Sequence, residues 1–145
     1  MMNPSLLQLA ATLLWSENDN STPEGGEPFD KNYDVCDIEE ASLNELHRRF
    51  QAFVDKAEAE ITKLKGSDWG SIDDFYTGSG TGGFYLEQDY IMTVNGHGCG
   101  FWEESDWEPK VGRILTDLAS QDKEIHCFTD HVDHGQDGRV YIEFC

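Results

Sequence analysis

The stretch SLNELHRRFQAFVDKAEAEITKLKG, residues 42–66, carries the strongest structural pattern in the chain. Apolar side chains recur in it at three- and four-residue steps, the spacing of one face of an α-helix. Ser42 and Glu45 match a capping box, and Gly66 suits the residue that follows a helix. A long amphipathic helix is therefore predicted to begin near Ser42 and to end before Gly66. Its predicted apolar positions are Leu43, Leu46, Phe50, Phe53, Val54, Ala57, Ile61 and Leu64.

Two shorter helices are predicted outside this stretch. Asn3 and Pro4 suit an N-cap and a first helical position, and an apolar stripe then indicates a helix over residues 4–15. Ser105 with Glu108 resembles a second capping box, and Pro109 is tolerated in a first helical turn. The stripe of the second short helix would be Trp107, Val111, Ile114, Leu115 and Leu118.

Two pairs of segments have the pattern of strands. Residues 90–94 and 100–102 flank Asn-Gly, a strong hairpin signal, and residues 84–86 can extend the first of them or form a strand of their own. Residues 124–129 and 139–144 flank a polar loop, and the last segment alternates apolar and polar side chains. We therefore predict a single α+β domain over residues 1–145. In it, a small antiparallel sheet of about four strands packs against the long amphipathic helix and the shorter helices.

The composition is strongly acidic. The chain has 29 Asp and Glu against 10 Lys and Arg, a formal net charge of −19. Residues 66–109 hold nine acidic residues and no Lys or Arg. Direct binding to nucleic acid or to an anionic membrane is excluded as a function class, because both need a basic patch. A basic protein is the partner that this charge favours.

The segment DYIMTVNGHGCGFWE, residues 89–103, resembles a largely uncharacterised family of small acidic bacteriophage and prophage proteins. Its members carry an N-G-H-G-x-G-F-W core. The sequence differs from the family pattern at Val94, Cys99 and Glu103, where Arg, Ala and Asp are usual. The resemblance implies a phage-derived protein that acts in the bacterial host cytoplasm, and it supplies no reaction. Four widely spaced cysteines fit reduced thiols there, and the apolar N-terminal run lacks the basic residues of a signal peptide.

These observations lead to the expectation of an acidic binding protein rather than an enzyme, with no cofactor and no metal. It would inhibit a host nucleic-acid-binding enzyme or defence complex by presenting a DNA-like negative surface, since carboxylates can replace phosphates in a basic groove. The predicted partner-binding residues are Asp68, Asp73, Asp74, Glu87, Asp89, His97, Trp102, Glu103, Glu104, Asp106 and Glu108.

Two other functions remain open from the sequence. A small metal-dependent hydrolase or nucleotide-modifying enzyme would use His97 with the cluster around His126, His131 and His134. The spacing of that cluster matches no standard zinc motif, however, and His97 also suits a glycine-rich turn with no catalytic role. A structural or assembly protein, acting as a homodimer, is the other alternative.

Overall fold

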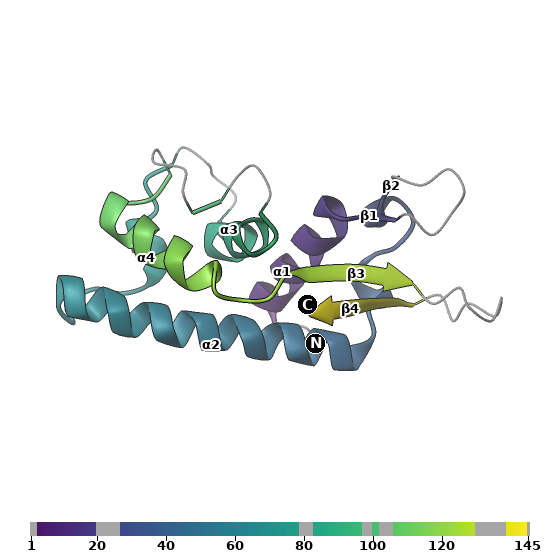
Figure 1. Cartoon of the computed structure of the whole chain (residues 1–145), viewed down its shortest axis with the longest axis horizontal. Helices are drawn as coiled ribbons and strands as arrows, with labels where there is room; N and C mark the ends of the chain where they lie inside the picture. Colours follow the sequence, from purple (N-terminus) through teal and green to yellow (C-terminus); the bar gives the residue numbers. More distant parts are fainter. Residues whose placement is uncertain are drawn as a thin grey trace. The chain divides into compact units, whose positions relative to one another are not determined.

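The computed structural model describes residues 3–19, 27–78, 83–96, 100–101, 106–129 and 139–144. The chain is α+β and mostly helical (Figure 1). It divides into two compact units, here called the terminal unit (Met1–His47 and Glu124–Cys145) and the central unit (Arg48–Lys123). Among the described helices, none combines the length and the apolar character that a membrane span requires.

The terminal unit begins with α1 (Pro4–Ser16), which confirms the predicted N-terminal helix. The side chain of Asn3 accepts a hydrogen bond from the Ser5 N–H at 2.7 Å, and Pro4 occupies the first turn. This is the expected cap, because it satisfies a backbone donor that the helix itself leaves free. The buried face of α1 contacts β3 (Ile125–Thr129) and two short 3-10 helices, η1 (Phe29–Lys31) and η2 (Val35–Asp37).

Strand β3 pairs antiparallel with β4 (Val140–Phe144), as predicted for these two segments (Figure 1). The register places Ile125 opposite Phe144 and Thr129 opposite Val140. Two hydrogen bonds of the β4 backbone join it to the start of α2 (Glu40–Lys65). The Ile142 N–H donates to the side-chain Oγ of Ser42, and the Val140 carbonyl accepts from the N–H of Glu39, the residue before the helix. A second sheet is minimal, with β1 (Asn18–Asp19) paired to β2 (Glu27–Pro28).

Helix α2 confirms the long amphipathic helix but begins two residues before the predicted capping box. The carboxylate of Glu39 accepts hydrogen bonds from the Ser42 N–H at 3.2 Å and from the Ser42 hydroxyl at 2.9 Å. Glu39 therefore caps the helix, and Ser42 lies in its first turn, where its hydroxyl also serves β4. At the other end, Gly66 has φ +80°, as predicted for the residue after the helix.

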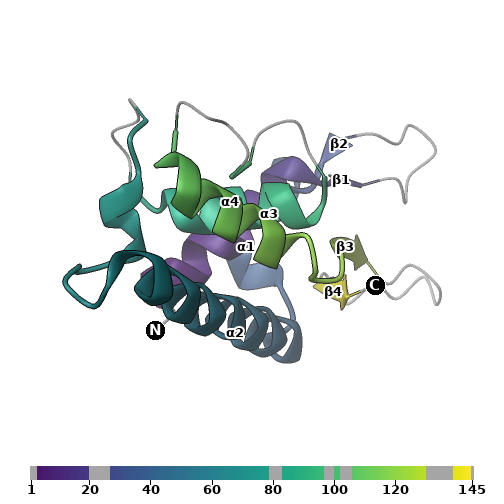
Figure 2. The same ribbon diagram turned by 60° about the vertical axis from the view of Figure 1, so that its left-hand side comes forward.

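The central unit packs the rest of α2 with η3 (Ile72–Phe75), α3 (Tyr85–Val94) and α4 (Pro109–Ala119). Figure 2 shows α3 beside α4, and the two helices are in contact. Aromatic rings fill the core between the elements of this unit. Tyr90 lies edge-on to Phe50 at 5.3 Å, and Phe101 stacks on Phe53 at 5.8 Å. Trp107, 1% exposed, contacts the edge of Phe101.

The prediction of strands at residues 84–86 and 90–94 was wrong, because residues 85–94 form α3. Leu86, Tyr90 and Val94 repeat every four residues and are buried together, so a helix buries the apolar side chains that a strand would split between two faces. Gly100 and Phe101 lie in a bend and a turn rather than in a strand. The sheet of about four strands is therefore not confirmed, and among the residues that the structure describes β3 and β4 form a sheet of two strands.

The second predicted short helix is confirmed as α4, but its N-cap differs from the predicted one. The Glu108 carboxylate accepts a hydrogen bond from the Lys110 N–H at 2.8 Å, and Pro109 occupies the first turn. Glu108 is therefore the N-cap itself rather than the third residue of a capping box. Ser105, the predicted N-cap, lies outside the described residues.

Candidate partner-binding surfaces

Three of the predicted partner-binding carboxylates are exposed together in one segment. Asp68, Asp73 and Asp74 lie between the end of α2 and the end of η3, in the central unit. We call residues 68–74 the acidic turn. Burial, and then the charge of Asp74, raises the pKa of Asp73. Asp74 is also the third residue of the capping box of η3, because its carboxylate accepts the N–H of the N-cap residue Ser71 at 2.8 Å. The acidic turn thus displays negative charge while part of that charge stabilises its own backbone.

Four other carboxylates of the predicted surface are buried or half-buried. Glu87 is 7% exposed, and Asp89 accepts a hydrogen bond from the indole N–H of Trp107 at 2.7 Å. The backbone carbonyl of Asp106 accepts the Thr77 N–H at 2.7 Å. Glu87 is therefore hidden from a partner and the Asp89 carboxylate is engaged inside the central unit, whereas the Asp106 contact involves only its backbone.

Glu108 also makes contacts within the central unit. Besides capping α4, it forms an ion pair with Lys65 at 2.8 Å. The hydrogen bond from Lys65 lowers the pKa of Glu108 and outweighs the opposing effect of burial. One carboxylate of the predicted surface is thus neutralised by a base of the long helix. The remaining predicted residues, His97, Trp102, Glu103 and Glu104, lie outside the described residues.

The negative charge is divided unequally between the two units. The terminal unit holds fifteen Asp and Glu against two bases, Lys31 and Arg139, a net charge of −13. The central unit holds fourteen Asp and Glu against eight Lys and Arg, a net charge of −6, which completes the −19 of the chain. All the partner-binding residues predicted from the sequence belong to the central unit, which is the less acidic of the two.

The terminal unit presents an aromatic pair on the solvent side of the β3–β4 strands. Ile125, Val140 and Ile142 are buried on the inner side. On the outer side, Phe128 is 46% exposed and stacks on Tyr141 with ring centroids 5.5 Å apart and 25° between the planes. The sequence contained a signal for this pair, because apolar and polar side chains alternate along β4 and place Tyr141 on the open face.

Carboxylates lie on the same outer side as the aromatic pair. Glu143 is exposed and pairs in register with His126, while Glu124 is exposed just before β3. We call Glu124, His126, Phe128, Tyr141 and Glu143 the outer face. Aromatic rings beside carboxylates offer two modes of contact to a Lys or Arg side chain, which can lie over a ring and pair with a carboxylate.

His126 is held between two carboxylates. Its Nδ1 is 2.7 Å from Glu17 Oε1, and its Nε2 is 3.1 Å from Glu124 Oε1. Burial lowers the pKa of His126, but the hydrogen bonds and charges of Glu17 and Glu124 raise it, and the net shift is upward. The same Glu17 oxygen accepts the Cys127 N–H at 3.3 Å. Glu17 therefore joins the end of α1 to the outer edge of β3.

The histidine cluster of the alternative metal site is described only in part. His131 and His134 lie outside the described residues, and His126 binds the two carboxylates. Within residues 3–19, 27–78, 83–96, 100–101, 106–129 and 139–144, no three His, Cys, Asp or Glu side chains are grouped so that they could hold a metal ion. Comparisons of the chain with protein-family models, with curated proteins and with solved structures found no match.

Proposed function

We propose that this chain is an acidic binding protein whose partner is a basic protein. The observation that carries the proposal is the charge of the terminal unit, fifteen acidic residues against two basic ones. Two bases can neutralise only a small part of that charge within the unit. Self-repulsion of this size lowers the stability of the folded state, and a basic partner would relieve it on binding.

The outer face is the contact that we propose for such a partner. Phe128 is nearly half exposed, and the apolar surface that it leaves in water would be buried favourably by a partner. Stacking on Tyr141 gives the partner a flat surface that is already formed, so little conformational entropy is lost when it binds. Glu124 and Glu143 would then pair with the cationic head of a Lys or Arg that covers the rings.

We further propose that the partner is a nucleic-acid-binding enzyme or defence complex of a bacterial host, inhibited because the carboxylates occupy its nucleic-acid groove. The resemblance of residues 89–103 to small acidic phage proteins supports the phage origin and the host cytoplasm. The exposed carboxylates of the acidic turn offer a second contact, on the central unit. Long-range attraction would speed association, and the aromatic contacts would slow dissociation.

The experiment starts with a low-salt pull-down from bacterial lysate, followed by purification of the captured protein. Binding is then measured by calorimetry between about 50 and 300 mM salt, and in competition with duplex DNA and with RNA. The proposal requires affinity that falls steeply with salt and a partner that releases its nucleic acid when this protein binds. A partner that binds DNA or RNA and this protein at the same time would contradict the inhibitor mechanism.

A pair of charge-matched variants tests the outer face. Glu124→Gln with Glu143→Gln removes two carboxylates beside the aromatic pair. Glu58→Gln with Asp117→Asn removes two exposed carboxylates of the central unit and serves as the control. We expect the first double variant to weaken binding about tenfold or more, and the control about twofold at most. Equal effects would show that net charge alone, and not the outer face, determines affinity.

A further inference from the structure

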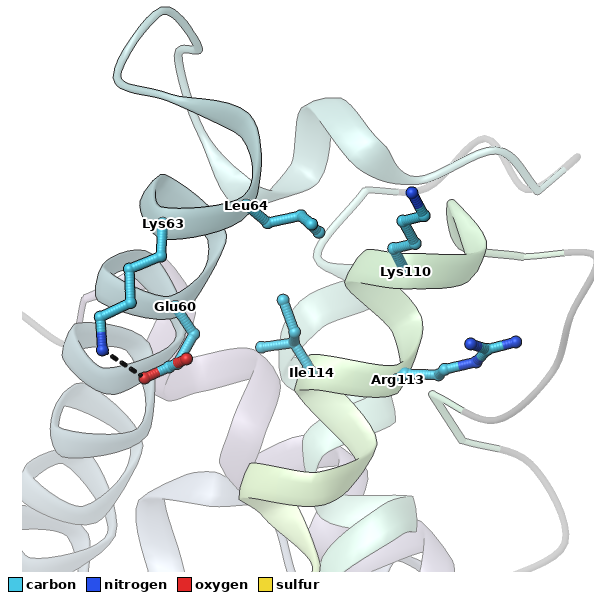
Figure 3. A pocket seen from close by; sticks show the side chains of 6 residues that line it. All are labelled: Glu60, Lys63, Leu64, Lys110, Arg113 and Ile114. Carbon is cyan, nitrogen blue, oxygen red and sulfur yellow. Dashed lines mark hydrogen bonds and ion pairs between the residues drawn. The ribbon is translucent and has the colours of Figure 1, made fainter.

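A hollow lined mainly by basic and apolar side chains lies between the last turns of α2 and the first turns of α4, within the central unit (Figure 3). It is shallow and open, with a volume of about 510 Å³. Helix α2 contributes Glu60, Lys63 and Leu64, and α4 contributes Lys110, Arg113 and Ile114. We call this hollow the α2–α4 groove. It unites three of the ten basic residues of a strongly acidic chain.

The floor of the groove is apolar. Leu64 is 43% exposed, and Ile114 is partly exposed. Figure 3 shows these two side chains extending from neighbouring helices into the space between them. A single exposed leucine is ordinary on a protein surface, but two aliphatic side chains that meet in a hollow between helices form a place for a partner's apolar side chain.

Basic side chains border this floor on both helices. On α2, Lys63 pairs with Glu60 at 3.1 Å, and both side chains are largely exposed, so the pair is weak and can exchange partners. On α4, Lys110 and Arg113 are exposed. The groove therefore has an apolar centre bordered by three bases and one carboxylate, Glu60, and this excess of positive charge favours an acidic ligand.

The positions of the two bases on α4 strengthen this conclusion. Lys110 lies in the first turn of the helix, Arg113 follows one turn later, and the last turn has no basic residue. The helix dipole favours cations at the C-terminal end and disfavours them at the N-terminal end. Neither base is therefore placed to stabilise α4 through its dipole. Lys110 instead lies near the N-cap carboxylate of Glu108, whose pKa it helps to lower, and its exposed side chain borders the groove.

We propose that the α2–α4 groove docks an acidic amphipathic helix of a partner protein. Its apolar stripe would cover Leu64 and Ile114, and its carboxylates would pair with Lys63, Lys110 and Arg113. This mode of recognition lays one helix in the groove between two others. The inference goes beyond the proposed function, because it gives the chain a second site with the opposite charge preference.

A synthetic peptide helix tests the proposal with the whole chain of 145 residues. The probe is a fluorescent 16-residue peptide with Leu at helical i, i+4 spacing and Glu at most other positions. A second peptide keeps the Leu residues and replaces Glu by Lys. Binding is measured by fluorescence anisotropy at about 150 mM salt, where the screening length near 8 Å suppresses repulsion from distant carboxylates. We expect saturable binding of the acidic peptide and at least about tenfold weaker binding of the basic one.

Three variants assign that binding to the groove. Lys110→Glu with Arg113→Glu reverses the α4 border, and Leu64→Ser removes part of the floor. Lys56→Glu with Lys123→Glu makes the same change in net charge at exposed positions that do not line the groove. We expect both groove variants to raise the Kd about tenfold or more, and the control to raise it about twofold at most. All the replaced side chains are exposed, and circular dichroism checks that the helices are intact.

Several results would overturn this proposal. They are the absence of saturable binding, equal binding of the Glu and Lys peptides, and equal losses in the groove variants and the control. Sedimentation gives a further test, because a dimer that dissociates on Lys110→Glu with Arg113→Glu would show that a second copy of the chain occupies the groove instead.

Discussion

The hydroxyl groups of two tyrosines in α3 give a sharp test of how the central unit is held together. The ring of Tyr90 is fully buried, and its hydroxyl donates a hydrogen bond to Asp122 Oδ2 at 2.7 Å. The hydroxyl oxygen of Tyr85 is also buried, but among the described residues no group pairs with it. Changing each tyrosine to phenylalanine keeps the ring and removes only the hydroxyl, so the two variants form a matched pair.

Only the Tyr90 variant should lose stability. A hydrogen bond to a charged group contributes about 1.5–3 kcal/mol. Because Asp122 is half-exposed and can turn to water, we expect Tyr90→Phe to lower the free energy of unfolding by about 1.5 kcal/mol, the low end of that range. Tyr85→Phe removes a buried polar atom without a described partner, so it should leave stability unchanged or raise it by up to about 1 kcal/mol.

Urea denaturation followed by tryptophan fluorescence measures both effects, since Trp107 is buried in the same unit. Burial, and then the hydrogen bond to Asp122, raises the pKa of Tyr90, so its hydroxyl remains a donor throughout neutral pH. Equal losses in the two variants, or a larger loss for Tyr85→Phe, would refute this account of the α3 contacts. A change in the denaturant slope would instead signal an altered unfolded state.

Three further predictions concern single residues. The folded-state pKa of His126 is raised, so its contribution to the free energy of unfolding is complete below about pH 6.5 and is lost as pH rises through the raised pKa. His126→Gln should therefore reduce the change of the free energy of unfolding with pH, measured by denaturation between pH 5 and 9. Burial raises the thiol pKa of Cys127, so peptide mapping after brief iodoacetamide treatment at pH 8 should find exposed Cys36 alkylated well before Cys127. Gly66→Ala should lower the free energy of unfolding by about 1 kcal/mol through backbone strain at φ +80°, although no atom crowds the added methyl group.

The spacing of apolar residues was sufficient to predict the elements in which buried side chains recur at one regular interval. The repeat of apolar residues after Ser42 predicts α2, and the alternation along residues 140–144 predicts β4. The helix starts were less well predicted, because Glu39 and Glu108 cap α2 and α4 in place of the expected serines. A carboxylate and a hydroxyl can both accept the same backbone N–H, so only the folded geometry distinguishes them.

Helix α3 shows where local pattern misleads. Tyr90, Ile91 and Val94 belong to residue types that favour strands, and the Asn-Gly that follows them is typical of a hairpin. In the fold, Tyr90 packs against Phe50 and Phe53 of α2, with ring centroids 5.3 and 4.7 Å away. Packing against a neighbouring helix outweighs intrinsic strand preference, and that neighbour is some forty residues away in the sequence.

The sequence by itself determined the net charge and the amphipathic faces of α2 and β4. Only the tertiary structure decided which charges are displayed. It joined Glu17 to His126, paired Glu108 with Lys65, and exposed Phe128 beside Tyr141. The physical reason is that composition adds up charge whatever the fold, whereas pairing and burial depend on distances between side chains that lie far apart in the chain.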